Sequence, residues 1–212
     1  MIHLIIPLSL QSEQLALPHG GRSVIRVPKL IAAPPSFLSA AKGFSVDLFA
    51  DKLRQPRKIA IAPDGNVFVV LTRLEWPVRK QPHEVVVLSG YDKSNRPSVR
   101  TTWSKDLDYP FGIQFGFGHV YVANTGSIVR WTYTFGQTAA KGKPEVIRDH
   151  IPARGYRNHW TRNILFDLKQ KSLFLMIGSV ESLDRVDARR AVIERYHLDP
   201  SGKIWRLRRT SR

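Results

Sequence analysis

The sequence predicts an all-β protein, a partial β-propeller of about three four-stranded blades. Apolar residues alternate with polar ones at a period of two, and Val, Ile, Phe and Tyr are concentrated in the same segments, which favours strands over helices. A strand–turn–strand pattern also recurs at a nearly constant interval of 51 to 54 residues. Self-similarity at such a period is typical of propeller blades.

Three segments carry the repeat, at residues 56–72, 110–125 and 161–179. Each begins with a short strand in which two apolar residues stand two positions apart, passes through a turn, and ends in a strand with a central aromatic residue. The first apolar residues are Ile59, Ile113 and Ile164, spaced by 54 and 51 positions. The aromatic residues are Phe68, Tyr121 and Phe174, spaced by 53 positions each. The turn after the first strand, Pro-Asp-Gly at 63–65, has the residues that tight hairpins favour.

Further strands are predicted where a four-stranded blade needs them. The third strands of the blades are expected at 83–89, 127–133 and 190–198, fourth strands at 97–103 and 144–149, and one additional strand at 43–50. Residues 187–198 fit a helix of about three turns equally well.

The domain is predicted to begin near Gly43. Residues 1–42 are interrupted by Pro and Gly and lack sustained periodicity, so we expect a leader or a poorly ordered extension. Residues 43–212 then form the propeller-type domain, with blades near 56–104, 110–150 and 161–208. Because rings close with four to eight blades, three blades predict a chain that is cut short or that associates through its open blade edges.

Composition limits the function classes. The chain has 33 Lys and Arg against 17 Asp and Glu, a formal net charge of +16, but the basic residues are scattered and no groove-binding motif accompanies them. We therefore expect a solvated basic surface and no specific nucleic-acid partner. Cys is absent, which excludes disulfides and thiolate chemistry. No segment is long and apolar enough to span a membrane, and the N-terminus lacks the cationic region and cleavage site of a clear signal peptide.

The loops that enter the first strand of each blade, and those that join its second and third strands, are expected to gather on one face of a propeller. His159 is in one of these loops, where an imidazole can act as a general base that Asn158 and Arg162 orient. A hydrogen-bonded structural histidine is the alternative. Arginines in or near the same loops suit a carboxylate or phosphate ligand, unless they are simply solvated; they are Arg57, Arg79, Arg154, Arg157 and Arg162.

Two tryptophans, Trp76 and Trp160, either stack on a flat ligand or fill space between blades. Paired carboxylates and HExxH or CxxC motifs are absent from the sequence, so glycosidase and metallohydrolase activities have little support.

Three stretches carry a family resemblance: residues 43–70, 109–133 and 158–179, the last containing the "NHWTR" loop followed by "IGS". Together they resemble the N-terminal half of the glucose/sorbosone dehydrogenases, six-bladed propellers that use pyrroloquinoline quinone (PQQ). The resemblance implies oxidation of a small sugar or aldehyde. It places His159 as the base that removes the proton of the substrate hydroxyl while hydride passes to the quinone. Arg162, Asn158 and Asn124 would then shape the cofactor pocket.

The resemblance also implies calcium, for which no ligands are assignable, and a periplasmic or secreted location. The family's later quinone-binding and calcium-binding loops have no counterpart in this sequence, so we expect a truncated enzyme, and the sequence leaves open whether it is active on its own. A non-catalytic binding or assembly module is the second hypothesis, since open sheet edges pair readily. Binding to polyanions is the third, and it predicts an affinity that falls steeply with salt.

Overall fold

A computed structural model describes residues 14–16, 22–24, 39–72, 83–105, 107–152, 159–179 and 189–209. The chain forms two compact units, one of residues 1–52 with 90–98 and the other of residues 53–89 with 99–212. Every regular element of the described residues is a strand, which confirms the predicted all-β class. Among these residues no helix is long and apolar enough to cross a membrane.

The first unit contains one small sheet, in which β1 (Gln14–Ala16) pairs antiparallel with β2 (Arg22–Val24). The strand predicted at 43–50 is absent; the structure has only an isolated bridge at Leu48. The reason lies in Asp47, whose buried carboxylate bonds to the Leu48 amide at 2.9 Å and to the Arg96 guanidinium at 3.3 Å. A side chain that bonds to the adjacent backbone in this way competes with a regular ladder.

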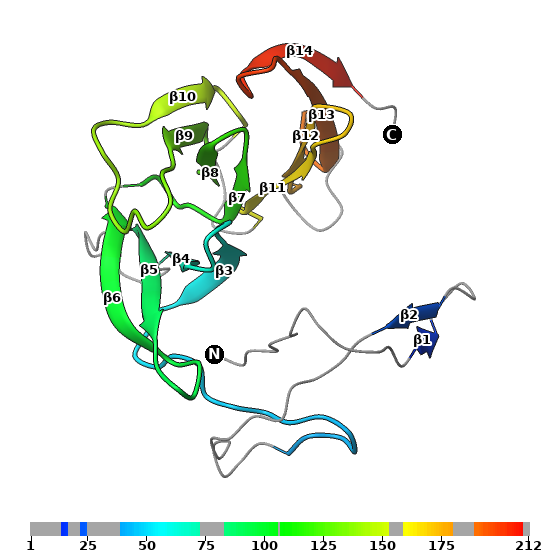
Figure 1. Ribbon diagram of the computed structural model, residues 1–212. Coiled ribbons are helices and arrows are strands. Elements are labelled where there is room, and N and C mark those ends of the chain that lie inside the picture. Colours follow the sequence, from blue (N-terminus) through cyan, green and yellow to red (C-terminus); the bar gives the residue numbers. More distant parts are fainter. Residues whose placement is uncertain are drawn as a thin grey trace. The chain divides into compact units, whose positions relative to one another are not determined.

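Three four-stranded antiparallel sheets make up the rest of the fold, and they have the order and form of propeller blades (Figure 1). The first sheet has the strands β3 (Pro56–Ile61), β4 (Val67–Leu71), β5 (Glu84–Tyr91) and β6 (Pro97–Ser104). The second has β7 (Gly112–Gly116), β8 (His119–Ala123), β9 (Ile128–Thr132) and β10 (Glu145–Arg148). The third has β11 (Arg162–Asp167), β12 (Ser172–Ile177), β13 (Val192–Leu198) and β14 (Ile204–Arg209).

Each sheet is a simple meander, with its strands neighbouring one another in chain order. The predicted third and fourth strands are present, and residues 192–198 form a strand and not the alternative helix. β14 was not predicted as a strand, because the arginines of that segment hide its alternation. The first strands of the three sheets lie together, with β7 against both β3 and β11, as at the hub of a propeller.

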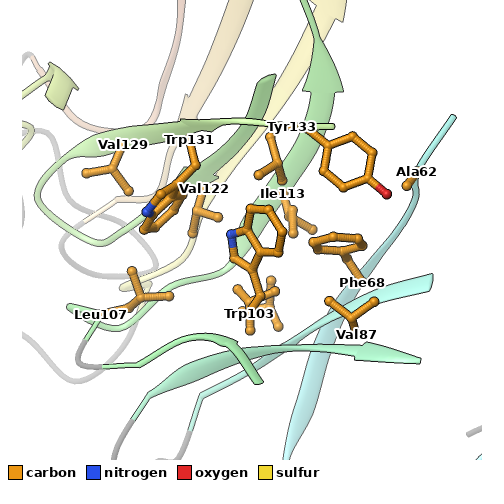
Figure 2. Close-up of a cluster of buried hydrophobic side chains, with 13 residues drawn as sticks. Ala62, Phe68, Val87, Trp103, Leu107, Ile113, Val122, Val129, Trp131 and Tyr133 are labelled. Atoms are coloured by element: carbon orange, nitrogen blue, oxygen red, sulfur yellow. The ribbon is translucent and has the colours of Figure 1, made fainter. Parts of the chain in front are cut away.

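An aromatic core joins the first and second sheets (Figure 2). At its centre Phe68 of β4 makes edge-on ring contacts, with centroids 5.1 Å from Trp103, 5.0 Å from Phe115 and 5.7 Å from Tyr133. Edge-to-face packing of this kind is favourable beyond the apolar area that it buries. The recurring aromatic at the centre of each second strand is therefore, in the first blade, a packing residue.

The second sheet is covered on both faces, which explains why β8 is apolar nearly throughout. Val120 and Val122 enter the core shared with the first sheet, while Tyr121 and Ala123 enter the core shared with the third. Side chains of a strand point alternately to its two faces, so each face receives one set. In the second core Tyr121 packs beside Ile164 and other residues of the third sheet.

Candidate functional site

The predicted loops do come together on one face. Thr72, at the end of β4, donates a hydrogen bond from its hydroxyl to the carbonyl of Pro110, just before β7. Thr125, in the β8–β9 turn, donates from its hydroxyl to the carbonyl of Trp160 at 3.0 Å. Loops of successive blades are thus bonded directly to one another. We call this face, formed by the described residues of the loops before β3, β7 and β11 and after β4, β8 and β12, the loop face.

His159 is held on the loop face by its backbone and its ring. Its φ of 57° lies in the left-handed region, which is unusual for a residue other than glycine. Its carbonyl accepts a hydrogen bond from Arg162 at 2.9 Å. Its Nδ1 lies 2.5 Å from the hydroxyl of Ser179, which follows β12. Within the described part of the chain, Nε2 has no hydrogen-bond partner.

Gly178 allows this close approach. A Cβ built at Gly178 would lie 2.7 Å from the carbonyl oxygen of His159 and 2.9 Å from its Cβ. Real Cβ atoms essentially never come so near, so any larger residue here would displace the histidine. The "IGS" sequence therefore supplies both the space for His159 and, through Ser179, a partner for its ring.

Arg162 begins β11 and its side chain is 0% exposed. Its Nη1 donates to the carbonyls of His159 and Thr161, both at 2.9 Å, and its Nη2 donates to the carbonyl of Pro152. The guanidinium thus ties the loop before β11 to the start of the strand. Burial, with a smaller repulsion from Arg190, lowers the pKa of Arg162 to about 10.

Arg190 plays the matching part on the other side of the site. It is buried, and it donates from Nε to the carbonyl of Gly178 at 3.3 Å and from Nη2 to that of Ser179 at 3.0 Å. One arginine therefore holds the His159 loop and the other holds the segment that faces it. Sequence reasoning did not identify Arg190, because it stands in a basic stretch with nothing to distinguish it.

Asn124 lies in the β8–β9 turn of the loop face and is buried. Its amide nitrogen donates to the hydroxyl of Ser127 at 3.1 Å, whereas its Oδ1 has no partner among the described residues. Asn158, the remaining residue predicted for the pocket, lies outside the described residues, as do Arg79, Arg154, Arg157 and Trp76. The roles given to His159, Arg162, Asn158 and Asn124 stay predictions.

Trp160 fills space between blades, the second of its two predicted roles. Its ring is only 9% exposed and has Phe111 at 6.0 Å and Tyr109 at 6.2 Å between centroids, with the guanidinium of Arg57 at 5.7 Å. Tyr109 in turn lies 4.4 Å from the ring of His83. These two half-buried rings bring a second imidazole to the loop face.

The described residues fit the quinone better than they fit calcium. Arg162 Nε is a buried donor and Asn124 Oδ1 a buried acceptor, and neither has a partner in the described structure. Such groups are costly unless a ligand, water or another residue satisfies them, and a quinone with carbonyl and carboxylate oxygens suits the donor. Calcium prefers six to eight oxygen ligands, yet no group of three or more His, Cys, Asp or Glu side chains among the described residues is placed to hold a metal.

Fold and loop face together define a propeller-type protein, of which the described residues form three blades. The comparisons agree: the TrAA12-like family profile matches residues 38–200, and the chain belongs to this family. None of the curated proteins matches the chain.

Solved structures show the same fold at low identity. The holo form of the pyranose dehydrogenase PQQ domain from Coprinopsis cinerea superposes with a TM-score of 0.63 at 18% identity, covering 80% of this chain and 41% of that one. An iodide structure of the AA12 carbohydrate-active enzyme of Trichoderma reesei gives 0.60 at 19% identity, covering 74% and 39%. A calcium structure of the same enzyme gives 0.60 at 18%, covering 78% and 44%. The chain thus spans less than half the length of these relatives.

Proposed function

We propose that the chain is the histidine-bearing part of a PQQ-dependent sugar dehydrogenase of the glucose/sorbosone type. The observation that carries this proposal is the fixed imidazole of His159, with Nδ1 engaged and Nε2 without a partner in the described structure. A side chain held in this way on the loop face suits a general base. Family membership, and fold similarity to a PQQ domain, support the same chemistry.

The mechanism assigns a step to each residue. His159 takes the hydroxyl proton of the substrate on Nε2 while the carbon of that alcohol loses hydride and becomes a carbonyl. A bound quinone would supply the hydride acceptor, a role that no side chain can fill. Arg162 would hold a quinone oxygen through Nε, and Asn124 would accept a hydrogen bond on Oδ1. The substrate is a small sugar, or an aldehyde in its hydrated form, which carries the hydroxyl that the step requires, and the protein works in the periplasm or outside the cell. No step depends on a calcium ligand of the described residues.

The test is a titration of the purified chain with PQQ and calcium, followed through the quinone absorbance and then by dye reduction with a panel of pyranoses and sorbosone. We expect the chain to bind PQQ and to reduce the dye, and we expect His159→Gln to lower the rate of dye reduction about a hundredfold or more. His119→Gln is the matched control, since His119 is half-buried in the β7–β8 hairpin and bonds to the carbonyl of Phe117. Unchanged quinone absorbance and no dye reduction with any sugar would end the enzyme proposal for this chain.

One observation favours the second hypothesis, an assembly module. The face of the third sheet turned away from the second exposes three large apolar side chains: Leu165 and Ile193 are each 52% exposed and Trp205 is 64% exposed. Strand register places Leu165 and Ile193 on that face, opposite the residues of the second core, and the ring of Trp205 lies 6.0 Å from that of His197 on the same face. We propose that a second copy of the chain covers it, sheet on sheet, because both interfaces between sheets of this chain are built in that way.

The mass of the protein in solution tests this hypothesis. We expect a dimer that Trp205→Lys combined with Ile193→Lys converts to a monomer. Phe135→Lys is the matched control, because Phe135 is more exposed and lies away from the third sheet in sequence, in the connection between β9 and β10 of the second sheet. A monomer over the whole accessible concentration range would contradict self-association.

A further inference from the structure

The hydroxyl of Ser179 has a position fixed from two directions. On one side Gly178 packs against the backbone and Cβ of His159 with no room for a side chain. On the other, Arg190 holds the carbonyls of both Gly178 and Ser179. The end of β12 is thus anchored by a buried guanidinium, and the hydroxyl that it presents is 2.5 Å from Nδ1 of His159. A short contact on a rigid support is the geometry of a residue that orients a base.

Among the described groups near the ring of His159, Ser179 is the one that can determine which ring nitrogen carries the proton. Arg162 and Arg190 only donate hydrogen bonds, and the described structure gives the ring of His159 no carboxylate or carbonyl partner. A serine hydroxyl can either accept from Nδ1–H or donate to a bare Nδ1. Only the first arrangement leaves an unprotonated Nε2, which is the nitrogen that remains for a substrate.

We propose that Ser179 is the positioning residue of His159: its hydroxyl accepts a hydrogen bond from Nδ1–H and so keeps the lone pair on Nε2. Arg190 supports this arrangement by fixing the serine backbone. The choice of the Nδ1–H form rests on the proposed function, because that tautomer leaves Nε2 to act as a base, whereas the contact between Ser179 and Nδ1 does not rest on it. Because the tautomer is a property of the protein without cofactor or substrate, it can be tested separately from turnover.

The test is ¹⁵N NMR of the protein labelled at histidine, at a pH of about 8.5, where an ordinary imidazole is neutral. His159→Gln identifies the His159 signals by their loss. His119 provides an internal standard, because its Nδ1 lies 2.5 Å from the carbonyl oxygen of Phe117, which can only accept. Its Nδ1 is therefore protonated when the ring is neutral. We expect His159 to show the same pattern, with the pyrrole-type shift at Nδ1.

Three variants complete the design. Ser179→Ala is expected to shift His159 to a mixture of both tautomers, and Ser179→Thr, which keeps the hydroxyl, to restore the Nδ1–H form. Ser172→Ala is the control, since it removes a buried hydroxyl at the opposite end of β12. Unchanged His119 signals report that each variant is folded. An Nε2–H tautomer in the unmodified protein, or a His159 spectrum that Ser179→Ala leaves unchanged, overturns the proposal.

Activity separates this inference from the proposed function. If the chain is a dehydrogenase, Ser179→Ala should lower kcat about tenfold or more, a moderate part of the effect of a misoriented base. KM should change little, because Ser179 is not assigned to substrate contact. A chain that shows the expected tautomers but no dye reduction would retain the positioning role of Ser179 and lose the enzyme proposal. The reverse result would retain the enzyme and remove Ser179 from its mechanism.

Discussion

At the scale of single residues, Gly112 sets how closely the hub strands approach. A Cβ at this position of β7 would lie 2.8 Å from the carbonyl oxygen of Arg162 and 3.0 Å from the amide nitrogen of Ile164, both in β11. Backbone atoms of a paired strand cannot move aside cheaply. We therefore predict that Gly112→Ala destabilises the protein by about 1–3 kcal/mol, as other overpacking changes do. Urea unfolding measures the effect.

Gly116 is the matched control on the same strand. There the nearest atoms to an added Cβ belong to the ring of Phe166, at 3.2 Å, and a side chain can shift by the few tenths of an ångström required. Gly116→Ala should accordingly cost less than Gly112→Ala. Equal losses for the two variants would mean that the contact between β7 and β11 is looser than described.

The candidate site illustrates which residues a sequence reveals. His159 was predicted from its residue type and its place before a strand, and it lies on the loop face. Ser179 and Arg190 were missed, because a serine after a strand and an arginine in a basic stretch are common. Their significance comes from contacts across 20 and 11 or 12 positions of the chain, which no local pattern encodes.

At the scale of elements, a tyrosine–carboxylate bond ties the first sheet to the second. The hydroxyl of Tyr133 donates to Asp64 in the β3–β4 turn at 2.7 Å, and the amide of Gly136 donates to the same oxygen. Burial, reinforced by this bond, raises the pKa of Tyr133 to about 12. Burial alone would raise the pKa of Asp64, but the hydrogen bonds from Gly136, Tyr133 and other donors bring it below its usual value.

These shifts predict how the bond depends on pH. A raised tyrosine pKa gives stability that is complete below the unfolded value of about 10 and is lost as pH rises towards 12. The lowered pKa of Asp64 gives stability that is lost as pH falls through the acid range. Tyr133→Phe should therefore have a lower urea midpoint than the unmodified protein at neutral pH. Above a pH of about 10 this difference in midpoint should disappear. A difference in urea midpoint between Tyr133→Phe and the unmodified protein that stays constant with pH would contradict this prediction.

A buried arginine ties the second sheet to the third. Arg130 is 2% exposed, and it donates to Glu145 at 2.9 Å, to the Tyr121 hydroxyl at 2.9 Å and to the carbonyl of Ser201 at 2.6 Å. Arg130→Met would remove three hydrogen bonds of a buried guanidinium, one of them to the buried hydroxyl of Tyr121, so we predict a loss of about 2–4 kcal/mol in the free energy of unfolding.

Lys203→Ala is the control for this prediction. Lys203 also binds Glu145, at 2.8 Å, but its side chain is 54% exposed. Lys203→Ala should therefore lower the free energy of unfolding by less than about 1 kcal/mol. Chemical denaturation of the two variants compares them directly. A larger loss for Lys203→Ala than for Arg130→Met would show that the exposed pair, and not the buried network, joins the two sheets.

Most strands were predictable because the period-two pattern is local. The repeat at 56–72, 110–125 and 161–179 matches β3–β4, β7–β8 and β11–β12 in order and register. β14 and the segment at 43–50 were not predicted correctly, for opposite reasons. In β14, arginines obscure the alternation of apolar and polar residues. At 43–50 the alternation is present, but the Asp47 carboxylate accepts a hydrogen bond from the adjacent backbone amide, which competes with a strand ladder.

At the scale of the whole molecule, the fold and the family are established, and the ligand is proposed. The three blades and the TrAA12-like family are established by the fold and by the match over residues 38–200. The binding of a quinone on the loop face is the proposal on which the chemistry depends. The boundary predicted at residue 43 between extension and domain stays a prediction, as does self-association through the third sheet.

Hydrogen exchange with and without PQQ is the measurement that tests the central proposal most directly, because it locates a ligand whether or not the protein turns over. The account predicts slower exchange at 123–127, 159–162 and 177–179, on the loop face. It predicts no change in the hairpin turns at the opposite ends of the blades, at 62–66, 117–118 and 168–171. Protection confined to those turns, or none at saturating PQQ, would contradict it.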